Sequence, residues 1–170
     1  MFRGLAARAA LHCWICLLPV MPAALAGQSP PPDMALAFVQ DHHLGESLGW
    51  LGYQVASRTV TFNTLVDAVG RTQAQTLVQA ELQRLQPDYQ TEWDRNLAAA
   101  YAQSFTAAEL QSLNTGDTQP ALANKFRAKQ RDVGMDMKNR SAELLKVYVS
   151  SALKSASEKA GIPGPEDTQE

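Results

Sequence analysis

The sequence predicts an all-α protein: a single helical domain of about six or seven helices that ends in a long helix and follows a cleavable signal peptide. Three observations lead to this prediction. Apolar residues recur at the three- and four-residue steps of a helix along most of the chain. Sustained strand-like alternation is missing from the sequence. Glycine, proline and capping residues separate the helical segments.

The first 26 residues have the pattern of a signal peptide. Two arginines give a positive start, residues 11–18 form an apolar run, and Ala24 and Ala26 make a small-residue cleavage site before Gly27. The run is too short to cross a bilayer as a helix. We therefore expect cleavage after Ala26 and a mature chain that begins at Gly27. Its expected location is the periplasm of a bacterium, with secretion as the alternative.

The amino-acid composition disfavours several classes of function. Both cysteines, Cys13 and Cys16, lie in the leader, so the mature chain would contain no thiol and no disulfide. The leader also takes two of the 15 basic residues and none of the 17 acidic ones, which leaves a net charge of −4. A nucleic-acid-binding domain is normally basic, so we expect no nucleic-acid partner. No other apolar run is long enough for a transmembrane span.

Two helices are expected after a Pro-rich linker over residues 27–33, at the start of a helical domain over 34–160. Asp33 can cap the first, whose inward side carries Ala35, Phe38 and Val39. The second follows an apolar stripe made of Leu44, Leu48, Leu51 and Val55. The glycines at 45, 49 and 52 weaken this helix or let another helix approach closely.

Two further helices are separated by Gly70. The helix before it carries its apolar side at Phe62, Leu65, Val66 and Val69. The one after it is expected to open at a capping box formed by Thr72 and Gln75. Its inward residues are Ala74, Leu77, Val78, Leu82 and Leu85. We expect Pro87 and Asp88 to stop this helix and to start the next one.

An aromatic stripe then leads to a corner in the chain. The stripe recurs every four residues at Tyr89, Trp93, Leu97, Tyr101 and Phe105. Thr106 and Glu109 match a capping box, so a new helix is expected to start there. We call Tyr101, Phe105, Thr106, Glu109 and Leu110 the corner. We expect it to be part of the core, and Glu109→Gln to be mild because glutamine can also complete the box.

The last helix is the longest. After a turn over residues 114–117, Asp117 or Thr118 is expected to cap it, with Pro120 in its first turn. Its apolar stripe consists of Leu122, Phe126, Val133, Met137, Leu144, Tyr148 and Ala152. It is expected to end near Lys159, before a disordered tail over 161–170. The sequence leaves open whether Gly134 breaks it.

Two patterns near residue 45 resemble catalytic or metal motifs. Residues 45–49 read Gly-x-Ser-x-Gly, but a nucleophile elbow needs a preceding strand, and no histidine follows Ser47. His42, His43 and Glu46 could form half of a metal site, yet zinc needs further ligands, and no other His or Cys remains in the mature chain. The interpretation we favour is a polar helix end. We expect no catalytic residue, metal or cofactor.

Four basic residues early in the last helix suggest one possible contact surface. They are Lys125, Arg127, Lys129 and Arg131; Lys138 and Arg140 continue the basic stretch, and Asp132 and Asp136 offset it. The default interpretation is that long cationic side chains flank an amphipathic helix. The alternative is contact with an anionic surface or an acidic partner.

The corner is also the centre of a resemblance to a known family. Tyr101 to Leu110 reads Tyr-x3-Phe-Thr-x2-Glu-Leu, and a turn, Pro120 and a long helix follow. With its secretion signal, this arrangement resembles the bacterial domain-of-unknown-function family twenty-fifty-nine. Members usually carry an aromatic pair and an x-Pro-x-Gly turn where this chain has residues 114–121. The resemblance implies an exported, all-helical domain and assigns no activity, cofactor or catalytic residue.

Function is therefore predicted only by class. The leading hypothesis is a non-enzymatic exported domain that works by contact with a protein or with the envelope. The alternative is a carrier of a small apolar ligand or lipid bound between the helices, because pockets between helices are common ligand sites and the three glycines could leave room for one. An enzyme is the least favoured hypothesis, because the sequence contains no credible set of catalytic residues.

Overall fold

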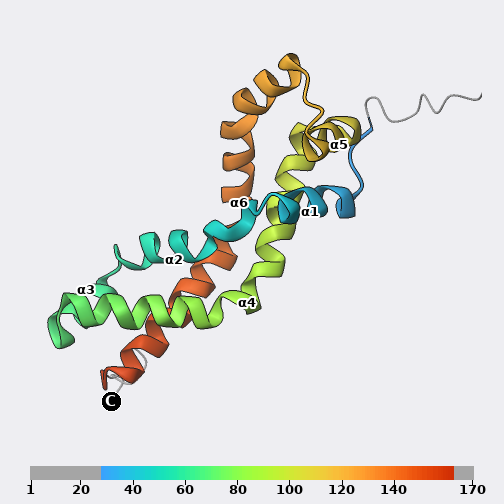
Figure 1. Cartoon of the computed structure of the whole chain (residues 1–170). Helices are drawn as coiled ribbons and strands as arrows, with labels where there is room; N and C mark the ends of the chain where they lie inside the picture. Colours follow the sequence, from blue (N-terminus) through green and yellow to red (C-terminus); the bar gives the residue numbers. More distant parts are fainter. Residues whose placement is uncertain (1–27, 163–170) are drawn as a thin grey trace, which may run out of the picture.

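The computed structural model describes residues 28–162, and within that range the regular structure is entirely helical (Figure 1). The elements in order are α1 (Pro32–Asp41), the 3-10 helix η1 (Leu44–Ser47), α2 (Leu48–Ala56), α3 (Val60–Val69), α4 (Arg71–Ser104), α5 (Ala107–Thr115) and α6 (Pro120–Lys159). The all-α class and the long final helix are thus confirmed. The predicted signal peptide, with Ala24, Ala26 and Gly27, lies outside the described residues.

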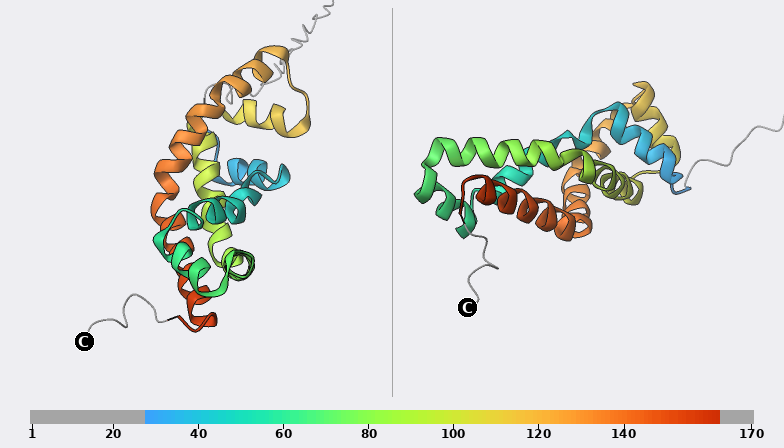
Figure 2. Two further views of the ribbon diagram at one scale, coloured as in Figure 1. Left: turned by 90° about the vertical axis from the view of Figure 1, so that its left-hand side faces the viewer. Right: turned by 90° about the horizontal axis from the view of Figure 1, so that it is seen from below.

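The two longest helices form the frame of the fold. Helices α4 and α6 share the most extensive contact, and Figure 2 shows α6 as a long curved edge of the molecule. Helices α1, α2 and α3 all pack on α4, while α5 packs on α1. None of the helices between residues 28 and 162 is both long and apolar enough to span a membrane.

Helix α4 does not stop at Pro87. It continues for 34 residues and changes direction sharply partway along, as Figure 1 shows. Proline has no amide hydrogen, and its ring crowds the carbonyl of residue i−4, so a proline inside a helix bends it. The expected stop and restart at residues 87 and 88 is therefore wrong: packing on α6 keeps both arms in one kinked helix.

A buried tyrosine fastens α6 to the turn before this kink. The Tyr148 hydroxyl donates a 2.7 Å hydrogen bond to the Leu82 carbonyl, and the Tyr148 and Tyr89 rings lie 5.1 Å apart. Tyr148 is fully buried, and this burial raises the pKa of its hydroxyl to about 12. Only the protonated hydroxyl can donate this hydrogen bond, so burial and the bond to Leu82 both favour the neutral form.

Helix α2 crosses close to this point because of Gly52. A Cβ atom there would lie 2.7 Å from Tyr148 Cε1 and 3.0 Å from Leu82 Cδ2. The close approach expected from the glycines is thus confirmed. The expected stripe of α2 is rotated, however. Leu48, Gly52 and Ala56 form its buried side, whereas Val55 is 39% exposed.

Three expected helix caps are wrong. Pro31 precedes α1, so Asp33 lies inside its first turn. Helix α4 begins at Arg71, directly after Gly70 with its positive φ of 84°, so Thr72 is already helical and forms no capping box. Gln119 precedes α6 in place of Asp117 or Thr118. In each case a proline or a glycine next to the helix sets where it starts.

Helix α6 is unbroken at Gly134, which is exposed and would accept a Cβ without any neighbour within 4 Å. Its stripe faces the core as expected, with Val133, Met137, Leu144, Tyr148 and Ala152 buried. The folded body extends past residue 160. The Ile162 amide donates to the Ser157 carbonyl at 3.0 Å, and the Ile162 side chain packs against the core.

Candidate functional site

The capping box of the corner is present. Thr106 accepts a hydrogen bond from the Glu109 amide at 3.3 Å, and the Glu109 carboxylate accepts one from the Thr106 amide at 2.9 Å. Helix α5 therefore begins at Ala107, immediately after the aromatic stripe of α4 ends. This local sequence signal predicts the helix start because both partners lie within four residues.

Glu109 has a second role that the sequence did not reveal. Both of its carboxylate oxygens accept from the Lys125 ammonium, at 2.8 and 2.7 Å, so the capping residue of α5 also holds α6. Lys125 lies 5.3 Å from the centre of the Phe105 ring. Burial alone would raise the pKa of Glu109, but Lys125 and the Thr106 amide outweigh it and lower the pKa.

The aromatic residues of the corner join α4 to α1 and α6. The Tyr101 ring lies 5.2 Å from Phe38 of α1 and 6.2 Å from Phe126 of α6, and Phe105 lies 5.8 Å from Phe126. Tyr101 and Phe105 are buried, as is Leu110 of α5. Burial also raises the pKa of the Tyr101 hydroxyl. The corner is part of the hydrophobic core.

The beginning of the described chain packs beside the corner. The Gln28 carbonyl accepts a 3.2 Å hydrogen bond from the Ala107 amide, one of the amides that a helix start leaves without an intrahelical partner. Pro30 is buried. Part of the expected linker over residues 27–33 therefore belongs to the folded body, and its last two residues already belong to α1.

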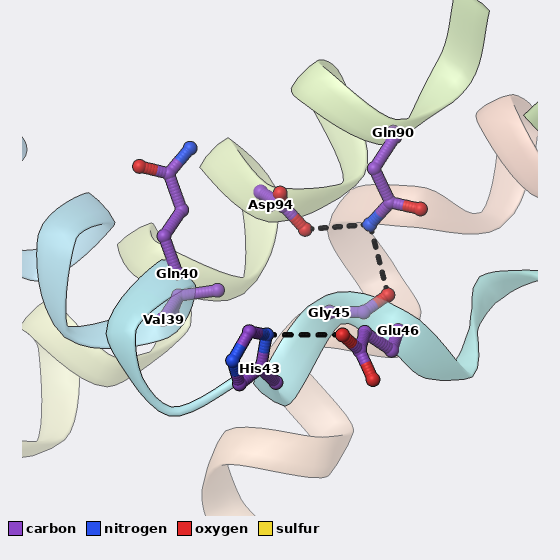
Figure 3. Close-up of a pocket in the computed structure, with 7 residues that line it drawn as sticks. All are labelled: Val39, Gln40, His43, Gly45, Glu46, Gln90 and Asp94. Atoms are coloured by element: carbon purple, nitrogen blue, oxygen red, sulfur yellow. Dashed lines mark hydrogen bonds and ion pairs between the residues drawn. The ribbon is translucent and has the colours of Figure 1, made fainter. Parts of the chain in front are cut away.

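A polar groove lies where the end of α1 and η1 meet α4 (Figure 3). Its volume is about 220 Å³, and it is lined by Val39, Gln40, His43, Gly45, Glu46, Gln90 and Asp94. The Gln90 amide donates to the Gly45 carbonyl at 2.9 Å and to Asp94 Oδ1 at 2.8 Å. The first bond fastens η1 to α4, and the second, within α4, orients the Gln90 amide. A Cβ at Gly45 would lie 1.8 Å from Asp94 Oδ1, which explains the glycine.

The groove also contains a histidine–carboxylate pair. His43 Nδ1 lies 3.0 Å from Glu46 Oε1, and the two side chains are 73% and 74% exposed. His43 has a positive φ of 53°, the only such non-glycine residue among those described. Its backbone lets the chain turn from α1 into η1. The groove thus offers hydrogen-bonding groups and two carboxylates to a small polar or cationic group.

The other motifs near residue 45 do not assemble. His42 packs against the Phe38 ring, 4.8 Å away, instead of joining His43. Within residues 28–162 no group of three His, Cys, Asp or Glu side chains could hold a metal ion. Ser47 lies at the end of the 3-10 helix η1 and not on a strand-to-helix turn, so it lacks the setting of a nucleophile elbow.

The four basic residues of α6 have different surroundings. Lys125 binds Glu109, and Lys129 pairs with Asp132 at 2.7 Å. Arg127 donates to the neutral Asn124 side chain at 2.9 Å, and Arg131 is exposed. The expected set of four is therefore divided: two of its charges are neutralised within the chain.

Sequence reasoning missed one buried charge. Glu81 is 1% exposed, and its carboxylate contacts the Arg84 guanidinium at 2.8 Å and the Lys159 ammonium. Burial alone would raise the pKa of Glu81, but the bonds to Lys159 and Arg84 and their charges lower it. One available signal was its position, because Glu81 lies on the apolar side of α4 between Val78 and Leu82.

No protein-family profile, curated protein or solved structure matches the chain. The resemblance of residues 101–130 to family twenty-fifty-nine therefore stays a prediction.

Proposed function

We propose that this protein is an exported, periplasmic helical domain without a reaction of its own, which works by surface contact with the envelope or with a protein partner. The observation that carries the proposal is the structural role of the groups whose pKa is shifted. Glu81, Glu109 and Tyr148 each join two helices. In enzymes such groups tend to gather in one cleft. Here Glu81 and Tyr148 fix α6 to neighbouring residues of α4, Glu109 fixes it at the corner, and none of the three is among the residues that line the groove.

The glycines give no support to the alternative of an apolar-ligand carrier. The space that they leave is occupied by the chain itself. A Cβ at Gly45, Gly49 or Gly52 would meet Asp94, Gln86 or Tyr148 at 1.8, 2.8 or 2.7 Å. The polar groove beside Gly45 offers amide and carboxylate groups, which suit a polar ligand better than a lipid tail. We therefore propose contact as the function.

The location part of the proposal is tested by fractionation in a Gram-negative host. We expect the protein in the periplasmic or envelope fraction, with Gly27 as its first residue by mass spectrometry. A chain that keeps residues 1–26 and stays in the cytoplasm would contradict export. Lipid extraction of the same material is expected to release no stoichiometric ligand, whereas one bound lipid per chain would favour the carrier.

The contact part is tested by complementation of a deletion strain. The double variant His43→Ala/Glu46→Ala removes the exposed pair of the groove and is expected to leave both the melting temperature and the phenotype unchanged. The matched control is Lys146→Ala/Glu143→Ala, an equally exposed pair on α6. If the groove variant alone loses the phenotype while its melting temperature is unchanged, the groove binds a ligand or substrate and the contact proposal is wrong.

A further inference from the structure

One face of α6 is strongly basic and contains no acidic side chain. Arg127, Arg131 and Lys138 are separated by four and seven residues, so they lie within about 40° of one another around the helix. All three are exposed, and no salt bridge within residues 28–162 involves any of them. We call these three residues, with Met135, the basic face.

The neighbouring acidic residues are already paired. Asp132 binds Lys129, and Asp136 binds Arg140, each at 2.7 Å. These pairs lie on the other side of the helix, about 120–180° from the centre of the basic face. The pairing matters because it leaves three cations without a salt bridge in the described residues, along about 16 Å of helix, in a mature chain whose net charge is −4.

Two further residues shape this face. Met135 lies between Arg131 and Lys138 along the helix, about 60° from the centre of the basic face, and is 54% exposed. Gly134 lies on the same side, with nothing within 4 Å of the position of its missing Cβ. A row of cations beside an exposed apolar side chain is one feature of helices that lie on a membrane surface.

We propose that the basic face binds the anionic headgroups of a lipid membrane, with α6 lying flat on it. The inference rests on the proposed exported contact domain and names its partner. Anionic lipid fits the proposed exported domain better than nucleic acid, because the envelope is the surface that an exported domain meets. It fits better than an acidic protein, because the cations follow one straight line and Met135 can enter the headgroup layer.

Such binding is weak, reversible and sensitive to salt. Each basic residue near an anionic surface raises the partition by roughly fivefold, so three together give about a hundredfold. This attraction fades within a distance of about 10 Å at 0.1 M salt. The net negative charge of the rest of the chain is repelled by the same surface, so it favours the orientation in which the basic face meets the lipid.

The test is co-sedimentation of the mature protein with vesicles. One set contains phosphatidylcholine alone, and the other contains about one third phosphatidylglycerol. The face variant is Arg127→Gln/Arg131→Gln/Lys138→Gln. The matched control, Lys129→Gln/Arg140→Gln/Lys146→Gln, removes the same number of charges from the same helix, but from residues that are paired. Circular dichroism checks that both variants are folded.

We expect the parent to bind only the anionic vesicles at low salt and to be released at about 0.5 M salt. The face variant is expected to lose about a hundredfold of this binding, and the control only a few-fold. Equal losses in both variants, or a parent that ignores anionic vesicles, would overturn the inference. If the parent ignores vesicles but the face variant leaves the envelope fraction in cells, the partner is an acidic protein. That outcome would support the proposed contact function and contradict lipid binding.

Discussion

The Tyr148 hydroxyl donates to the Leu82 carbonyl at 2.7 Å, in the turn just before the proline that bends α4. Each arm of α4 makes separate contacts with other helices, and this bond fixes α6 close to the place where the arms meet. It is a buried bond between elements that are distant in the sequence.

Removing only this hydroxyl should therefore destabilise the fold. Tyr148→Phe leaves the ring in place and removes one buried hydrogen bond, while the Leu82 carbonyl keeps its place inside α4, so we expect a loss of about 0.5–1.5 kcal/mol in the free energy of unfolding. Chemical denaturation at neutral pH measures it. The same substitution at Tyr53, whose hydroxyl makes no side-chain hydrogen bond among those found in residues 28–162, is the control and should change stability less.

The same residue predicts an alkaline limit to stability. Its pKa is about 12 in the folded protein and near 10 when unfolded. The unfolded chain therefore loses this proton first, and stability falls as the pH rises from 10 towards 12. The full difference corresponds to roughly 3 kcal/mol. Because Tyr148→Phe cannot ionise, its stability should fall less steeply with pH over this interval than that of the parent, and parallel curves would contradict the assignment.

Two glycines in helices should respond oppositely to alanine. Gly52→Ala forces a Cβ to 2.7 Å from the Tyr148 ring, so we expect a loss of about 1–3 kcal/mol. Gly134→Ala meets open space and gains helix propensity, so we expect a gain of up to about 1 kcal/mol. Thermal denaturation of both variants decides the point. A neutral Gly52→Ala would mean that α2 can move away from α6.

The buried Glu81 should make the end of α6 sensitive to acid. Lys159→Met removes one of the two cations that hold the carboxylate, and we expect a loss of about 1–3 kcal/mol at pH 7. The pKa of Glu81 is lowered in the folded state, so the stability it confers is present above about pH 4.5 and is lost as the pH falls through the folded pKa.

Without Lys159 that pKa rises, so the loss of stability should begin at a higher pH than in the parent. Urea denaturation across the acid range measures this shift. Lys154→Met, an exposed lysine on the same helix, is the matched control and should follow the parent. If both variants behave alike, the contact between Lys159 and Glu81 contributes nothing to stability.

The corner gives a prediction that differs from the one made from the sequence. Glu109→Gln keeps the capping bond but loses the charge that binds Lys125, so it should not be mild. A double-mutant cycle with Lys125→Met should give a coupling of about 1 kcal/mol that shrinks with salt. The more exposed pair of Lys129 and Asp132 should give a smaller coupling. Equal couplings would mean that the partial burial of Glu109 has no effect.

Patterns among residues close in the sequence predicted much of this fold. Contacts between residues far apart in the sequence were missed. The capping box at Thr106 and the stripe of α6 were predictable, because their partners lie within a few turns of one helix. Pro87 was misread because the sequence does not show that packing on α6 holds both arms of α4 in one helix. The groove was missed in part, since Gln90 and Asp94 meet Gly45 across 45 or more residues.

The contacts that close α6 onto α4 also determine when the chain can fold. They join residues 62, 66 and 78 positions apart: Tyr89 with Ser151, Leu82 with Tyr148, and Glu81 with Lys159. Contacts of such long sequence separation form late, because a large loop must close first. During synthesis, the side of α4 that packs on α6 therefore remains uncovered until the final helix has left the ribosome. A chain whose fold is incomplete until its last helix is made can still pass unfolded through a narrow translocation pore, as the proposed export requires.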